Sequence, residues 1–167
     1  MMELLIVVVG VMLAAAGTGG GFAEPVPYVP TLMGGPRDPE PQEPSGLFTT
    51  AAEVRPVLEA TQGDWVMIRE YDGKDLVYFT HLLSWRCGIW EIQYSFNDLD
   101  PDSVQLLPME PCHEGTRMPN ALTDETGDFL PYVEAPLGSV EGIGVEVFYD
   151  DGTSDWVWYT RDFVLRP

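Results

Sequence analysis

The sequence predicts an all-β or β-dominated fold, an antiparallel sandwich or partly open barrel of six to eight strands with one short N-terminal helix. Residues 89–96 alternate between apolar and polar side chains, the period of a strand with one face on the core and one in water. Asp72-Gly73 and Asp151-Gly152 each separate two apolar runs, and Asp-Gly favours the turn of a β-hairpin. Only residues 51–61 carry a helical period.

Residues 1–23 are interpreted as a cleavable signal peptide. Leu4 to Ala16 form an apolar run that is shorter than a bilayer span, and Gly21 and Ala23 occupy the small-residue positions before a cleavage site. No basic residue precedes the run, so an uncleaved anchor is the alternative. We expect an exported protein, periplasmic or secreted, with no membrane span after cleavage.

Residues 24–46 contain seven prolines and no apolar period, which predicts an extended, disordered linker. A ligand for a proline-recognition domain is the alternative. Residues 47–167 then form a single β-rich domain.

The predicted helix has Val54, Val57 and Leu58 on one face. Thr50 and Glu53 match a capping box, but that start would place Pro56 too deep in the helix. We therefore expect a later start, with Pro56 in the first turn.

The first hairpin joins strands near 65–71 and 76–83. A two-residue Asp72-Gly73 loop would set Glu70 opposite Asp75, a repulsive pair, whereas a four-residue loop from Asp72 to Asp75 would avoid it. The sequence leaves both registers open.

The second hairpin joins strands near 143–150 and 153–160. A two-residue Asp151-Gly152 loop would place Val147 opposite Trp156 and Val145 opposite Trp158. This register predicts four large apolar side chains on one face.

The chain is strongly acidic, with a formal net charge of −19. Removal of residues 1–23, which contain one Glu, leaves 8 basic and 26 acidic residues, or −18. Such a chain repels phosphate backbones and anionic lipid, so neither nucleic acid nor a membrane surface is expected as a partner. The charge serves solubility or attracts a basic partner.

In an oxidising compartment the two cysteines, Cys87 and Cys112, are most simply a disulfide. This bond would tie down the irregular, proline-rich stretch between residues 108 and 136. Zinc ligation together with His81 and His113 is a weaker alternative, because the spacing fits no closed zinc module.

The spacing of Asp98, Asp100 and Asp102 is that of the start of a calcium loop. Ser103 and Met109 then stand where a Gly and a bidentate Glu are needed, so a solvated turn is the better interpretation and a weak calcium site the alternative. No cofactor is predicted.

Five tryptophans (Trp65, Trp85, Trp90, Trp156 and Trp158) either fill a small core or form a platform for a glycan or a peptide. Trp156 and Trp158 are the candidate binding surface. Arg69, Arg86 and Arg117 could bind an anion, but pairing with nearby carboxylates is the simpler interpretation in so acidic a chain.

Residues 69–73, 76–81 (LVYFTH) and 84–88 (SWRCG) resemble a group of small exported bacterial proteins. The resemblance runs from about Thr49 to the terminal hairpin, and it implies export and pairing of Cys87 with Cys112. It implies no activity, ligand or catalytic residue.

The sequence contains neither a Gly-x-Ser-x-Gly elbow nor a Ser-x-x-Lys motif. We therefore expect a non-catalytic module of the cell envelope that binds a protein or a glycan. A hydrolase with a pair of catalytic carboxylates, and a structural envelope protein, are the alternatives.

Overall fold

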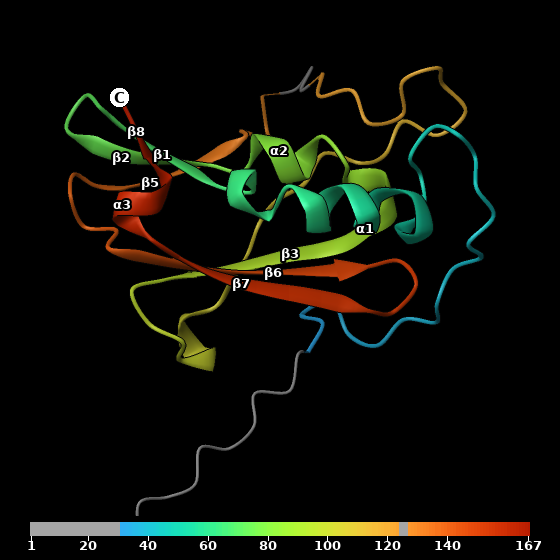
Figure 1. Cartoon of the computed structure of the whole chain (residues 1–167), viewed down its shortest axis with the longest axis horizontal. Helices are drawn as coiled ribbons and strands as arrows, with labels where there is room; N and C mark the ends of the chain where they lie inside the picture. The colour runs from blue at the N-terminus through green and yellow to red at the C-terminus, as the bar shows by residue number, and fades with distance from the viewer. Residues whose placement is uncertain (1–30, 124–126) are drawn as a thin grey trace, which may run out of the picture.

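The computed structural model describes residues 31–123 and 127–167, which form two four-stranded sheets (Figure 1). Sheet A has the order β5-β2-β1-β8, and sheet B has the order β4-β3-β6-β7. All pairings are antiparallel except that of β1 with β8. The prediction of a β-dominated sandwich is confirmed. The strands are β1 Met67–Tyr71, β2 Lys74–Tyr78, β3 Ile89–Phe96, β4 Gln105–Leu106, β5 Tyr132–Pro136, β6 Gly142–Tyr149, β7 Ser154–Thr160 and β8 Leu165–Arg166.

The helices are few and short. Helix α1 spans Ala51–Ala60 and lies along sheet B on the same side as sheet A (Figure 1). Helices α2 (Thr80–Leu83) and α3 (Arg161–Val164) have one turn each, and three 3₁₀ turns cover Gln62–Asp64, Arg86–Gly88 and Pro101–Ser103. Residues 80–83 were expected to continue a strand, and their helical turn corrects that expectation.

The core lies between the inner faces of the sheets and under α1. Its fully buried side chains include residues of sheet A (Ile68, Val77), sheet B (Ile92, Ile143, Val145, Val147) and α1 (Ala51, Val54, Leu58). Burial of these groups is the main favourable contribution to folding.

Helix α1 starts earlier than predicted, so Pro56 lies inside it. Partners distant in sequence satisfy the first amides of the helix: Asp150 Oδ1 accepts from Ala51 N at 2.8 Å, and Gln42 Oε1 accepts from Ala52 N at 2.8 Å. These bonds fix the helix N-terminus at Ala51, at the cost of a proline beyond the first turn.

The first hairpin has the two-residue loop, with Glu70 opposite Asp75. Asp72 and Gly73 have φ angles of 48° and 74°, the left-handed values that a type I′ turn requires. Arg161 makes the acidic pair tolerable, because its guanidinium binds both carboxylates.

The register predicted for the second hairpin is wrong by one residue. Val145 lies opposite Val157, and Trp156 lies opposite Glu146. The loop has three residues, Asp150 to Gly152, closed by a 2.8 Å bond from Tyr149 N to Thr153 O, and Gly152 has φ of 84°. The two tryptophans therefore lie on the face opposite the core valines.

Strand β3 departs from the predicted alternation at a β-bulge. The pairing with β6 shifts by one residue between Ile89 and Glu91, and Trp90 turns away from the core face that holds Ile92. The polar face was expected to lie in water, but Glu91, Gln93 and Ser95 are only 2%, 3% and 4% exposed.

Part of the predicted linker covers this face. Glu91 accepts hydrogen bonds from Met33 N and Gly34 N, and Gln93 Nε2 donates to Thr31 O at 2.8 Å. Trp90 Nε1 donates to Glu40 Oε1 at 2.9 Å. Residues 31–46 contain neither helix nor strand, and the predicted signal peptide lies outside the described residues.

Within residues 31–123 and 127–167, no helix has the length and apolar character that crossing a bilayer requires.

Candidate binding site

The candidate surface residues Trp156 and Trp158 lie together on the outer face of sheet B. They alternate along β7 with Val157 and Tyr159, whose side chains point toward the core. Trp156 is 45% exposed, and Trp158 is half-buried. The outer face of an edge strand thus carries two large aromatic groups.

Two glycines of β6 make room for Trp158. A Cβ added at Gly142 would lie 2.2 Å from Trp158 Cζ2, and one added at Gly144 would lie 3.4 Å from Trp158 Cε3. The indole therefore packs directly on the backbone of the central strand. A side chain at Gly142 would displace it.

A groove of 190 Å³ runs beside Trp156, lined by Ser95, Leu99, Val104 and Trp156. Leu99 and Val104 come from the connection between β3 and β4, and Leu99 is 58% exposed. A smaller hollow of 20 Å³ continues it over Gly144 and Glu146. A cavity of about 150 Å³ holds a benzene-sized group, so the groove can take one bulky apolar side chain.

The hydroxyl groups near the groove already have protein partners. Ser95 Oγ donates to Asp98 O at 2.9 Å, and Ser154 Oγ donates to Glu146 Oε1 at 3.0 Å. The groove thus offers an apolar surface with its polar atoms engaged.

Exposed acidic residues adjoin the groove-lining residues in the chain and give the groove an acidic rim. Asp98 and Asp100 flank Leu99, and Asp102 lies two residues before Val104. Their loop is held by its own hydrogen bonds: Asp98 Oδ1 accepts from Asp100 N at 3.1 Å, and Asp100 Oδ1 accepts from Asp102 N at 3.0 Å. Among residues 31–123 and 127–167, no three acidic, His or Cys side chains gather as a metal site would require.

The other three tryptophans contribute to packing. Trp65 is fully buried and donates from Nε1 to Leu58 O at 2.9 Å. Trp85 packs edge-on against Phe48 at 5.0 Å between ring centroids, and Trp90 lies beneath Arg37. Of the five tryptophans, only Trp156 lines the groove, and Trp158 lies two residues further along β7 on the same face.

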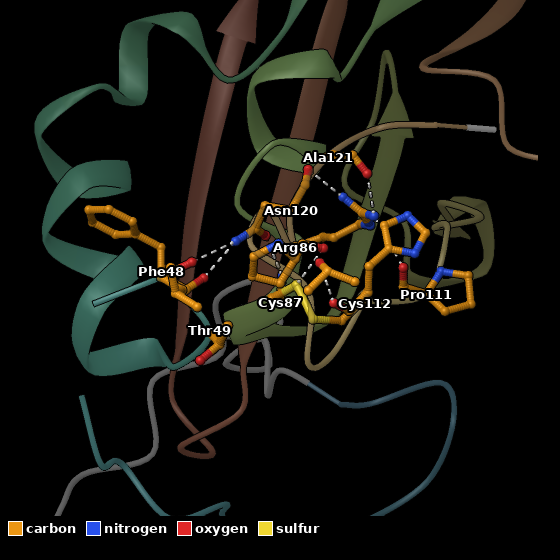
Figure 2. Close-up of a disulfide and its surroundings, with 12 residues drawn as sticks. Phe48, Thr49, Arg86, Cys87, Pro111, Cys112, Asn120 and Ala121 are labelled. Atoms are coloured by element: carbon orange, nitrogen blue, oxygen red, sulfur yellow. Dashed lines mark hydrogen bonds between the residues drawn. A yellow bond between two sulfur atoms is a disulfide. The ribbon is translucent and has the colours of Figure 1, made fainter. Parts of the chain in front are cut away.

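The predicted disulfide between Cys87 and Cys112 is present (Figure 2). Beside it, Arg86 is buried and donates to backbone carbonyls of the long irregular stretch: to Glu110 O at 2.6 Å, Asn120 O at 2.7 Å, Pro111 O at 3.1 Å and Ala121 O at 2.9 Å. Burial lowers the pKa of the guanidinium, and the Glu110 carboxylate at 3.5 Å opposes this shift.

Arg86 is thus a structural residue that holds the stretch folded. The sequence favoured pairing of Arg86 with a nearby carboxylate over anion binding, and Glu110 forms that pair at 3.5 Å, but the contacts with backbone carbonyls were not predicted. One feature of the sequence could have indicated this role. Arg86 stands next to a cysteine whose disulfide partner lies in a long stretch without strands, and the carbonyls of such a stretch need donors from elsewhere.

Neither histidine approaches the sulfurs as a zinc ligand would. His81 Nε2 lies 2.8 Å from Thr61 Oγ1, and His113 Nε2 lies 3.0 Å from Glu110 Oε1. Burial lowers the pKa of His81, which favours its neutral form.

The fold and the surface define a disulfide-bonded β-sandwich with an apolar groove on the outer face of one sheet. Comparison of the chain with family models, with curated proteins and with solved structures yields no match.

Proposed function

We propose that this protein is a non-catalytic binding module of the cell envelope and that it holds a partner protein in the groove beside Trp156. The observation that carries the proposal is a half-exposed indole beside a groove of 190 Å³. Exposed tryptophans next to apolar pockets are the usual anchors of protein interfaces.

A protein partner fits the groove better than a glycan does. A sugar ring needs hydrogen-bond partners for several hydroxyls, and the hydroxyls of Ser95 and Ser154 are already engaged. An apolar side chain needs none. The acidic rim at Asp98, Asp100 and Asp102 favours basic residues next to that side chain.

An oxidising location supports the envelope assignment. Disulfides persist in exported proteins and are rare in the cytosol, and the Cys87–Cys112 bond joins two segments of the domain. The signal-peptide pattern of residues 1–23 and the resemblance to small exported bacterial proteins agree with it.

The alternative of a carboxylate-based hydrolase has weaker support. Three buried carboxylates serve the fold: Asp75 binds Arg161, Glu91 binds the segment at Met33 and Gly34, and Asp150 binds Ala51. Glu146, which lines the smaller hollow, accepts from Ser154 Oγ at 3.0 Å. Desolvation raises the pKa of Asp150, but this residue lies in the β6–β7 turn, away from the groove.

Peptide titration tests the proposal. Acetylated pentapeptides of sequence Gly-Lys-Phe-Lys-Gly, Gly-Lys-Ser-Lys-Gly and Gly-Glu-Phe-Glu-Gly would be added to ¹⁵N-labelled protein while the indole N–H signals are followed by NMR. We expect the Lys-Phe-Lys peptide to shift the indole N–H signal of Trp156 and the Ser peptide to leave it unchanged. The Glu-Phe-Glu peptide should bind about fivefold more weakly than the Lys-Phe-Lys peptide.

Trp156→Ala should abolish binding of the Lys-Phe-Lys peptide. Phe163→Ala is the matched control, because Phe163 is an aromatic residue of similar exposure on α3, outside the groove. Three results would contradict the proposal. They are equal responses to the Phe and Ser peptides, undiminished peptide binding by the Trp156→Ala variant, and binding of neutral chitotriose at Trp156 that is tighter than that of the Lys-Phe-Lys peptide.

A further inference from the structure

The outer face of sheet A carries a second hollow, of different chemistry. It has a volume of 260 Å³ and is lined by side chains of β1, β2 and β5 and of the first hairpin turn. Strand register sets them in rows: Arg69, Leu76 and Glu134 lie side by side, and Tyr78 lies opposite Tyr132 in the next row. The hollow is remote in sequence from the Trp156 groove and shares no residue with it.

Aromatic rings supply much of the wall of this hollow. The rings of Tyr78 and Tyr132 lie 5.1 Å apart, and Tyr71, at the other end, is 61% exposed. Leu76, only 8% exposed, lies between these ends in the middle of β2. Rings of this kind stack on the C–H faces of sugars, and their hydroxyls give and accept hydrogen bonds.

The hollow also holds an arginine, Arg69, that forms no ion pair with a carboxylate of the described residues. The Arg69 guanidinium lies 5.4 Å from the centre of the Tyr71 ring, and no carboxylate within residues 31–123 and 127–167 forms an ion pair with it. By contrast, its neighbour Lys74 binds Glu134, and Arg55 binds Asp155. Arg117 and Arg166 also form no ion pair within the described ranges, but of these three arginines only Arg69 lines the hollow.

We propose that this hollow binds a saccharide unit that carries a carboxylate, a uronic acid. The tyrosines stack on the ring, and Arg69 makes a charge-assisted, bidentate pair with the carboxylate. Charge complementarity at Arg69 selects the acid over the neutral sugar. A long polyanion would meet the net negative charge of the whole chain, so the preferred ligand is short.

Calorimetric titration of the disulfide-bonded protein tests this inference with three probes: digalacturonate, its dimethyl ester and neutral galactobiose. We expect digalacturonate to bind about tenfold more tightly than the ester, the difference that one charge-assisted hydrogen-bonded pair provides. The ester and galactobiose should bind about equally, because they lack the charge.

Two variants separate a built site from general charge. Arg69→Gln should reduce the affinity for digalacturonate to the level of the affinity for the ester. The affinity for the ester itself should not change. Arg166→Gln removes the same charge from the adjacent strand β8, opposite Arg69 and outside the hollow, and should preserve the tenfold preference. Tyr132→Ala should weaken the binding of all three sugars.

The inference is overturned by equal affinity for acid and ester, by no measurable binding of digalacturonate, or by equal losses in Arg69→Gln and Arg166→Gln. It is also overturned if an acidic pentapeptide, Gly-Glu-Ser-Glu-Gly, binds at Arg69 more tightly than the sugar acid. None of these results bears on the Trp156 groove, whose test uses other probes and another signal.

Discussion

At the scale of single residues, Arg161 decides the register of the first hairpin. Its guanidinium donates to Asp75 at 2.7 and 3.0 Å and also binds Glu70, while Gly138 N and Val140 N complete the shell of the buried Asp75 carboxylate. The hydrogen bonds from Arg161 hold the pKa of Asp75 below its ordinary value.

Arg161→Gln should destabilise the fold by about 3 to 5 kcal/mol, because it leaves a buried carboxylate without its cation and exposes the repulsion from Glu70. Urea unfolding followed by far-UV circular dichroism measures the loss. Adding Glu70→Gln to this variant should recover part of it. If the double variant is no more stable than Arg161→Gln alone, the account of the acidic pair is wrong.

Glu53 gives a pH-dependent contribution at the start of α1. Partial burial opposes ionisation, but hydrogen bonds from Thr49 N, Gly46 N and Ser45 Oγ outweigh it and lower the pKa of Glu53 from 4.5 to about 2. A lowered pKa in the folded state means that the stabilisation is complete above 4.5 and is lost as the pH falls toward 2.

Glu53→Gln should therefore destabilise the protein at pH 7 and have a much smaller effect at pH 2.5. Urea midpoints of the two proteins at both pH values measure this. Glu59→Gln, on the exposed end of the same helix, is the control and should show no such convergence. Midpoint differences that stay constant with pH would refute the role of the Glu53 carboxylate.

At the scale of elements, the two Asp-Gly pairs show what the sequence can and cannot predict. The pattern of apolar runs was sufficient to place both hairpins and the fold class. The loop lengths were not predictable from the pairs themselves: Asp72 and Gly73 both adopt positive φ, whereas in the second turn Gly152 does so and Asp151 does not. There, Asp150 also caps α1 through Ala51 N, a contact across 99 residues.

The same limit applies to the groove. Trp156 and Trp158 were identified as candidates, but the predicted register placed them on the face of Val145 and Val147, because a one-residue change in register moves every side chain of β7 to the other side. The outer-face glycines Gly142 and Gly144, which accommodate Trp158, lie at an alternating spacing in β6 that is a usable sequence signal.

Gly142→Ala tests this packing. The added Cβ would lie 2.2 Å from the Trp158 ring, so the indole must move, and we expect a loss of about 1 to 3 kcal/mol together with weaker binding in the adjacent groove. Thermal unfolding and the peptide titration measure the two effects. Gly63→Ala, whose Cβ would meet Phe163 at an ordinary 3.5 Å, is the control. Equal unfolding temperatures for the two variants would refute the packing argument.

At the scale of the whole molecule, two chemically different surfaces lie on the outer faces of the two sheets. One is an apolar groove with an acidic rim, and the other is a tyrosine-lined hollow with a cation. A core shared between the sheets fixes both, so a variant on one outer face leaves the other intact. This separation is what allows each surface to be tested by itself.

The irregular stretch of residues 107–123 is held in two ways that act on different states of the chain. Arg86 binds carbonyls in the folded state, and the Cys87–Cys112 bond, across 25 residues, restricts the unfolded state. The chain-entropy model assigns about 3.5 kcal/mol to a loop of this length.

The double variant Cys87→Ser/Cys112→Ser should therefore lose about 3.5 kcal/mol in urea unfolding and show a larger m value, because its unfolded chain exposes more surface. Amide exchange of residues 110–121 in the folded state should change little, since the bonds from Arg86 remain. Arg86→Met should have the opposite effects. Amide exchange in this stretch should become faster, because four carbonyls lose their donor, and the m value should stay unchanged, because the disulfide still restricts the unfolded chain. If the stretch exchanges freely in the serine variant, the covalent bond holds the folded loop as well, and the division between the two states is wrong.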